Sequence, residues 1–138
     1  AGETLPCSSY QIHPGGKGLN QSIAMAAAGA KVRHAGKVGE DGRWLLDLMA
    51  IKNIDVGMMK IDQGPTGHAN IQVTPEGENS IVLFGGANRT ITKSHIDEVL
   101  EDAKSGEFLL LQNEISALDY LIDQACEKKC ALCLMRPP

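Results

Sequence analysis

The residues best suited to chemistry lie in the segment Gly15-Gly16-Lys17-Gly18, with Asn20 close behind. Consecutive glycines let backbone N–H groups approach a ligand closely, and a helix that begins after them directs its positive end to the same place. Lys17 can donate several hydrogen bonds, and Asn20 can both donate and accept. A phosphate cradle is one interpretation, and a plain turn between a strand and a helix is the other. A P-loop is excluded, because glycine follows Lys17 where that motif needs Ser or Thr.

A single carboxylate, Glu114, stands just beyond the apolar run Phe108–Leu111, which is typical of a short buried strand. Open α/β sheets bind ligands at the carboxyl ends of their strands, so a carboxylate here can accept hydrogen bonds from a bound molecule. A solvated loop glutamate is the alternative. Structural roles are expected for two other polar residues: Asp41 as a helix cap, and His68 as a polar residue on a strand face.

The four cysteines are Cys7, Cys126, Cys130 and Cys133. Cys126 and Cys130 fall at helical spacing, and Cys133 lies in an apolar run that predicts a strand. Metal sites usually show paired ligands at short spacing, and no histidine is near these cysteines in sequence. We therefore expect buried, reduced thiols, with a metal site or a disulfide as the alternative.

Composition narrows the classes of partner. The formal net charge is −4 and aromatic residues make up 4% of the chain, which argues against binding to polyanions or stacking on nucleic-acid bases. No apolar run approaches the ~20 residues of a membrane span. The first residues show no basic-then-apolar secretion pattern. We expect a cytoplasmic protein that binds neither nucleic acid nor membrane.

Helix-like and strand-like segments alternate along the chain. The pattern predicts helices at 19–28, 42–52, 92–104 and 116–129. It predicts strands at 31–37, 53–61, 68–74, 79–84, 108–111 and 131–135, with a further extended stretch at 4–13. Pro75-Glu76-Gly77-Glu78 is a good turn tetrad and joins two of the strands into a hairpin. This alternation favours an α/β fold with a mostly parallel sheet, to which the hairpin is a side feature.

An ordered set of short motifs continues from the glycine turn along nearly the whole chain. In chain order they are Gly2-Glu3-Thr4, Gly15-Gly16-Lys17-Gly18-Leu19-Asn20-Gln21-Ser22, Gly29, Val38-Gly39-Glu40-Asp41, Asn53-Ile54-Asp55, Thr66-Gly67, Gly77-Glu78-Asn79, Gly86-Ala87-Asn88 and Glu114. Together they resemble the amino-terminal part of the ribokinase-like (PfkB-family) carbohydrate kinases. A lone glycine motif would be a weak signal, whereas this ordered set is specific.

The resemblance implies a ribokinase-like α/β fold with a mostly parallel central sheet, flanking helices and a small β lid. Residues 1–138 would form the amino-terminal part of one such domain, with lid strands at approximately 4–13 and 66–84 and an α/β core in the remainder. Family members also carry a strand before the Gly-Glu-Thr step and a second half with an Asp-Thr-x-Gly-Ala-Gly-Asp-like segment. Nothing in these 138 residues resembles that segment, so we expect a partial domain.

The resemblance also assigns sugar-binding residues. Those expected to bind the sugar are Gly15, Gly16, Lys17, Asn20 and Glu114, with Ala69, Ile71 and Leu83 on a lid face that presses on the sugar or on a partner lid. An ordinary sheet edge is the alternative for the lid strands. Because the catalytic base and the nucleotide pocket belong to the family's second half, no catalytic, nucleotide-binding or metal-binding residue is expected in this chain.

The implied reaction is transfer of the γ-phosphoryl group of ATP to a sugar hydroxyl, with Mg²⁺ neutralising phosphate charge. ATP and Mg²⁺ are the implied cofactors, and a monovalent cation is left open. The Gly-Gly-Lys-Gly-x-Asn form favours ribose as the acceptor, with nucleosides and fructose phosphates as alternatives. A homodimer through the lid strands is the expected assembly. The rival functions are a non-catalytic sugar-binding protein and a redox or metal module built on the C-terminal cysteines.

Overall fold

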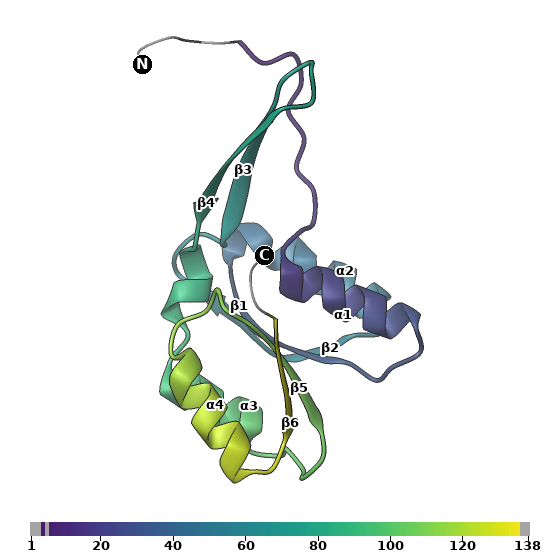
Figure 1. The fold of residues 1–138 in the computed structure, drawn as a ribbon, viewed down its shortest axis with the longest axis vertical. Coiled ribbons are helices and arrows are strands. Elements are labelled where there is room, and N and C mark those ends of the chain that lie inside the picture. Colours follow the sequence, from purple (N-terminus) through teal and green to yellow (C-terminus); the bar gives the residue numbers. More distant parts are fainter. Residues whose placement is uncertain (1–3, 5, 136–138) are drawn as a thin grey trace.

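The structure, a computed structural model, describes residue 4 and residues 6–135 (Figure 1). Helices and strands alternate along the described chain, as the sequence pattern predicted. The elements are α1 (Lys17–Ala27), β1 (Arg33–Gly39), the short 3₁₀ helix η1 (Glu40–Gly42), α2 (Arg43–Ile51), β2 (Asp55–Asp62), β3 (His68–Val73), β4 (Asn79–Phe84), the 3₁₀ helix η2 (Gly86–Thr90), α3 (Lys93–Leu100), β5 (Phe108–Gln112), α4 (Leu118–Glu127) and β6 (Ala131–Met135).

The first part of the core is a β1–α2–β2 unit that α1 also covers (Figure 1). β1 and β2 are parallel, with Val38 opposite Ile61. Leu19 of α1, Met49 of α2 and Ile54 form one buried apolar cluster, so both helices pack on this pair of strands. The alanines of α1 favour a helix and their small side chains allow it to lie close to its neighbours.

The second part of the core repeats this design with α3, β5, α4 and β6. β5 and β6 are parallel, and α3 and α4 pack together through a separate apolar cluster. The buried members of this cluster are Ile96, Leu100, Leu111, Leu121 and Ala125. Thr92 caps α3, because its hydroxyl accepts a hydrogen bond from the backbone N–H of His95 at 3.2 Å.

Within the described residues the strands form three two-stranded sheets, two parallel and one antiparallel. The predicted α/β class, parallel strands flanked by helices with a separate antiparallel hairpin, is therefore confirmed. The two parallel pairs, β1–β2 and β5–β6, share no hydrogen-bonded strand neighbour in this part of the chain. The contacts that join them include that of α1 with β5, the packing of η2 on β1 and the ion pair of Lys60 with Glu98.

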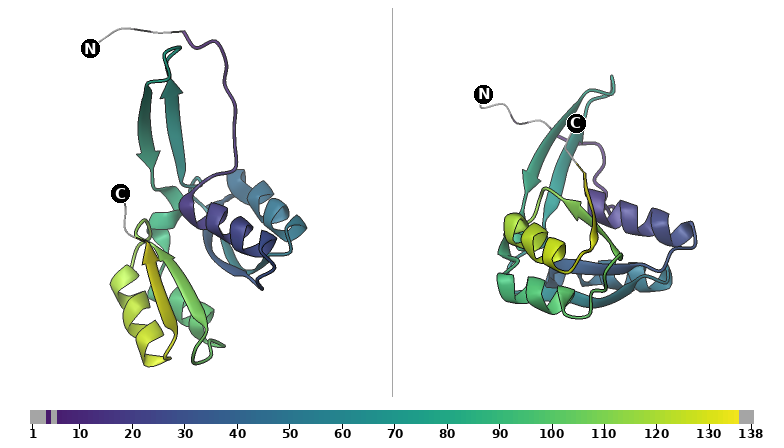
Figure 2. Two further views of the ribbon diagram at one scale, coloured as in Figure 1. Left: turned by 45° about the vertical axis from the view of Figure 1, so that its right-hand side comes forward. Right: turned by 60° about the horizontal axis from the view of Figure 1, so that its bottom comes forward.

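The antiparallel hairpin β3–β4 extends away from the core (Figures 1 and 2). Its register places Ala69 opposite Leu83 and Ile71 opposite Ile81. Directly opposed residues project to the same face of an antiparallel pair, so the predicted shared face of Ala69, Ile71 and Leu83 is confirmed. Every residue of both strands is exposed, on this face and on the other.

The lid strand predicted at approximately 4–13 is not formed. Residue 4 and residues 6–16 adopt neither helix nor strand where the structure describes them. A strand needs a neighbour with which to exchange backbone hydrogen bonds, and Pro6 and Pro14 lack the N–H donor that such pairing uses. Gly2 and Glu3, which belong to the first of the recognised motifs, lie outside the described residues.

The four cysteines form no disulfide in the structure, and their predicted burial is wrong. Cys7, Cys126 and Cys133 are exposed, and Cys130 is half-buried. Cys126 lies on the outer side of α4, and Cys133 lies on β6, four of whose five residues are exposed. The apolar composition of residues 131–135 predicted a buried strand. In the structure no helix or strand of the described chain covers the face of β6 that contains Cys133. No helix in the described residues is long and apolar enough to cross a membrane.

Candidate functional site

The amino end of α1 and the carboxyl end of β5 meet in an ion pair. Lys17 Nζ donates to Glu114 Oε1 at 2.7 Å, although the two residues are 97 positions apart in the sequence. Their side chains are 49% and 44% exposed, so a ligand can reach both charges. The structure thus brings together the lysine and the carboxylate that the sequence had suggested as binding groups, while their binding role stays a prediction.

The glycine turn leads into α1 in a conformation that favours glycine. Gly16 has φ 98° and ψ 142°, a left-handed value that side chains rarely adopt. A Cβ at Gly15 or Gly16 would meet no atom within 4 Å, so the backbone of this turn borders open space. Among the described residues no side chain caps α1, which leaves its first N–H groups available to a ligand. A molecule with acceptor atoms can therefore approach the turn directly.

Asn20 extends this polar edge along the helix. It is exposed and lies three residues after Lys17, a spacing that makes the two side chains neighbours on the helix surface. With Glu114 opposite, the edge offers a cationic donor, an amide that donates and accepts, and an anionic acceptor. This mixture suits a ligand whose neighbouring groups both donate and accept, as hydroxyl groups do.

A layer of polar contacts beneath α1 positions the ion pair. Gln112 of β5 donates from its side chain to the side chain of Gln21. Ser22 Oγ and His34 Nδ1, on α1 and β1, lie 2.7 Å apart, and burial lowers the pKa of His34. These contacts tie α1 to both parallel pairs. These contacts were not predicted from the sequence, where the one available signal was that Gln21 and Ser22 are polar residues in an otherwise alanine-rich helix.

The other predicted site residues, Ala69, Ile71 and Leu83, are not brought onto the ion pair. They share a face of the hairpin, whose base lies near the meeting point of α1 and β5 (Figures 1 and 2). No hydrogen bond in the described chain joins either hairpin strand to Lys17 or Glu114. These three residues thus flank the site at most, and their binding role stays a prediction.

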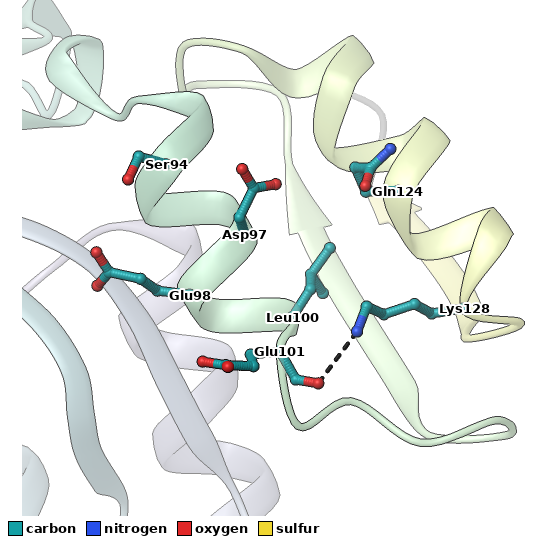
Figure 3. A pocket seen from close by; sticks show the side chains of 7 residues that line it. All are labelled: Ser94, Asp97, Glu98, Leu100, Glu101, Gln124 and Lys128. Carbon is teal, nitrogen blue, oxygen red and sulfur yellow. Dashed lines mark hydrogen bonds between the residues drawn. The ribbon is translucent and has the colours of Figure 1, made fainter.

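A second candidate is the groove of about 490 Å³ between α3 and α4 (Figure 3). Asp97, Glu98 and Lys128 of the groove already have partners inside the protein. Tyr120 donates to Asp97, Lys60 pairs with Glu98, and Lys128 Nζ donates to the carbonyl of Glu101. Within the described residues no group of three or more His, Cys, Asp or Glu side chains could hold a metal ion, in this groove or elsewhere. Three of the four charged side chains that line the groove are thus engaged within the protein.

The predicted helix cap at Asp41 is wrong. Gly42 is the N-cap of α2, and no side chain caps that helix. The Asp41 carboxylate instead accepts hydrogen bonds from the backbone N–H and the hydroxyl of Thr66, and these bonds lower its pKa. Thr66 lies 25 positions away, so no local pattern could have shown this partner.

The comparison with protein families matches residues 1–134 to the pfkB family carbohydrate kinase model. Among curated proteins, the ribokinase of Bacillus subtilis is 38% identical over 130 residues, which are 92% of this chain and 43% of that protein. The chain thus spans less than half the length of this relative.

Solved structures give the same result. The ribokinase of Thermotoga maritima matches with a TM-score of 0.82 and 31% identity, covering 96% of this chain and 44% of that one. The ribokinase of Arabidopsis thaliana, solved with ribose and ATP, matches with a TM-score of 0.78 and 27% identity, covering 97% and 46%. Motifs, fold and family match agree, and the chain belongs to the pfkB family of carbohydrate kinases.

Proposed function

We propose that this chain supplies the sugar-binding part of an ATP-dependent kinase that phosphorylates a hydroxyl group of ribose. The contact between Lys17 and Glu114 is the observation that carries the proposal. It places a donor and an acceptor at the carboxyl end of β5, where α/β folds bind ligands. Ribose is favoured as the acceptor because the chain is similar to ribokinases, one of which was solved with ribose and ATP.

Each residue of the site has a distinct task in this proposal. Glu114 accepts hydrogen bonds from sugar hydroxyls, while Lys17 and Asn20 donate to sugar oxygens. Gly15 and Gly16 leave room for the sugar against the backbone of the turn. Sugar binding at this edge replaces part of the contact between Lys17 and Glu114 by hydrogen bonds in which each charged group meets a sugar hydroxyl.

The phosphoryl donor is ATP, and Mg²⁺ neutralises charge on its phosphates when bound. Phosphoryl transfer depends mainly on positioning and on charge stabilisation, and these residues contribute the positioning of the acceptor. We assign ATP, Mg²⁺, any monovalent cation and the catalytic base to parts of the kinase other than these 138 residues. The 138 residues by themselves are accordingly expected not to phosphorylate ribose. A kinase of this kind is proposed to work in the cytoplasm, where ATP is available.

The hairpin is proposed to act as the lid. An isolated two-stranded hairpin is at best marginally stable in water, so the apolar face of Ala69, Ile71 and Leu83 needs a cover. A sugar in the site, or the same face of a second copy, would supply it. Closing a lid over the sugar also excludes water, which competes for the phosphoryl group.

A single substitution on each face tests the proposed homodimer. Leu83→Arg places a charge on the face that contains Ile71, whereas Val82→Arg places one on the opposite face. Leu83→Arg is expected to shift the light-scattering mass from dimer to monomer, with Val82→Arg unchanged. Equal behaviour of the two variants would contradict assembly through this face.

Titration calorimetry and a coupled kinase assay test the function in the longest polypeptide that the reading frame encodes. Glu114→Gln is expected to weaken ribose binding by roughly 10- to 100-fold, as loss of a hydrogen bond to a charged group does. Glu107→Gln is a matched control, because Glu107 forms an ion pair with Arg33 at similar exposure. Fructose phosphates and nucleosides are measured alongside ribose.

The outcomes are distinct. Ribose binding with phosphoryl transfer, weakened at Glu114 alone, supports the proposal, and binding without transfer would favour a non-catalytic sugar-binding protein. Tighter binding of a nucleoside or a fructose phosphate would replace ribose as the acceptor. Equal ribose affinity in Glu114→Gln and the unsubstituted protein would overturn the assignment of the site.

A further inference from the structure

Both ends of the hairpin pass through one crowded region, which we call the hairpin base: residues 39–42, 64–67 and 85–88. Glycines allow its three segments to touch. A Cβ at Gly86, where φ is 47°, would lie 2.5 Å from the carbonyl of Pro65, and a Cβ at Gly67 would lie 2.6 Å from the carbonyl of Gly85. Backbone therefore packs directly on backbone here, and small changes in one segment must displace another.

Thr66 is the residue of this region with the most specific contacts. Its backbone N–H and its hydroxyl both donate to Asp41 Oδ1, at 3.0 and 2.7 Å. Its hydroxyl oxygen also accepts a hydrogen bond from the backbone N–H of Gly39 at 2.9 Å. Hydrogen bonds to an ionised carboxylate are stronger than neutral ones, so Asp41 is the main polar restraint on Thr66.

The segment around Asp41 is shaped to receive this threonine. A Cβ at Gly42 would overlap the Thr66 hydroxyl, and a Cβ at Gly39 would overlap the carbonyl of Gly64. Both glycines are buried. The turn that follows β1 therefore holds the threonine two residues before β3 begins, and fixes the point at which the hairpin leaves the core.

The returning end of the hairpin is held by the loop that carries Glu114. The backbone N–H of Ser116 donates to the carbonyl of Asn88 at 3.1 Å, and Ser116 Oγ donates to the carbonyl of Ile91 at 2.8 Å. The hairpin is thus fixed at one end to the turn after β1 and at the other end to the candidate site. Its orientation relative to Lys17 and Glu114 depends on both attachments.

We propose that Asp41 is a positioning residue for the lid: by holding Thr66, its carboxylate sets the direction of the β3–β4 hairpin relative to the sugar site. Asp41 touches neither Lys17 nor Glu114 in the contacts of the described chain and acts through Thr66. This role rests on the proposed function only where it concerns the sugar, since the attachment of the hairpin is a property of the fold.

The first test is amide hydrogen exchange measured by mass spectrometry on the longest polypeptide of the reading frame. Asp41→Ala removes the acceptor of both Thr66 bonds and is expected to speed exchange in residues 66–86 by about tenfold, with α3 and α4 unchanged. Asp41→Asn keeps an acceptor oxygen and is expected to restore most of the protection. Glu40→Ala is the matched control, because Glu40 lies on the same turn and contacts Arg43 instead.

The second test is the kinetic effect on phosphorylation of ribose. A hairpin that is correctly oriented for only part of the time lowers the apparent affinity by that fraction, so Asp41→Ala should raise KM by about tenfold and change kcat by less than about twofold. Asp41→Asn should return KM towards its original value. A general loss of folded enzyme would instead lower kcat and leave KM unchanged.

Unchanged exchange in the hairpin, or faster exchange throughout the protein, would overturn the proposal. A lowered kcat with constant KM would do the same. If the unsubstituted protein phosphorylates no sugar, the proposed function fails, and the exchange experiment then decides the role of Asp41 alone. Faster exchange confined to residues 66–86 and reversed by Asp41→Asn would support that role.

Discussion

The parallel pair β1–β2 and the antiparallel pair β3–β4 have the same number of strands, but the first is covered by helices and the second is exposed to solvent. α1 and α2 cover β1–β2, and this unit contains buried Val38 and Met49. β3–β4 has no helix on either side and no buried residue (Figure 1). The apolar side chains of the first pair stabilise the fold, whereas those of the second are left for something outside the described chain.

This contrast shows where each pair obtains its stability. Burial of apolar side chains under helices stabilises β1–β2 by the hydrophobic effect. The hairpin gains little from burial, so its order depends on its own turn and backbone pairing and on its attachment at the base. A core supported in the first way is rigid, and a hairpin supported in the second way is suited to move when a ligand binds.

The largest expected difference is in the free energy of unfolding when the same substitution, isoleucine to alanine, is made in the core and in the hairpin. Ile96 is 3% exposed and Ile71 is 59% exposed. Ile96→Ala is expected to lower the free energy of unfolding by about 2–5 kcal/mol, because it removes packed methyl groups and leaves a cavity. Ile71→Ala should cost less than about 1 kcal/mol. Urea unfolding measures both, and equal losses would show that the hairpin is covered in solution.

A smaller effect is expected at glycines of the hairpin. Gly86 has φ 47° and no room for a Cβ, whereas Gly77 in the turn has φ 88° and open space around it. Gly77→Ala should cost about 1 kcal/mol from backbone strain, and Gly86→Ala about 2–4 kcal/mol from strain and overpacking together. Thermal unfolding monitored by circular dichroism compares them. A Gly86→Ala variant as stable as Gly77→Ala would show that the hairpin base is loosely packed.

The smallest effect concerns the network that joins β1–β2 to η2 and depends on pH. Asp62 accepts hydrogen bonds from Thr90 Oγ1 at 2.6 Å and from the backbone N–H of Gly64 at 2.9 Å, and it pairs with Lys37. These contacts, the Thr90 bond above all, lower the pKa of Asp62. The stabilisation is therefore complete above the unfolded-state pKa of about 3.9 and is lost as pH falls through the lower folded-state pKa.

Urea unfolding between about pH 6 and pH 2.5 measures this loss. Asp62→Asn should reduce the fall in stability over the acidic part of that range, and Asp123→Asn, on the exposed side of α4, serves as the control. An identical pH dependence in Asp62→Asn and the unsubstituted protein would show that the network contributes no linked stability.

Element types were largely predictable, because the periodicity of apolar residues is a local property. The bounds 79–84 and 131–135 agree with the structure. The hairpin turn forms one residue earlier than the predicted tetrad Pro75–Glu78, because the backbone N–H of Gly77 donates to the carbonyl of Thr74. The helix expected at 92–104 ends at Leu100. The residues after it form a turn, in which the backbone N–H of Ala103 donates to the carbonyl of Leu100. The strand predicted at 4–13 was wrong for a different reason. An extended sequence pattern does not show whether a second strand is present to form backbone hydrogen bonds with it.

At the candidate site, the sequence determined which groups are available and the tertiary structure decided which of them meet. Glycines at 15 and 16, Lys17, Asn20 and Glu114 could be named because their residue types and flanking patterns carry a chemical meaning of their own. The contact of Lys17 with Glu114, the polar layer beneath α1 and the bonds from Thr66 to Asp41 required the fold. Hydrogen bonds and ion pairs act over a few ångströms, so between residues 12 to 97 positions apart they exist only after burial of the core has brought the elements together.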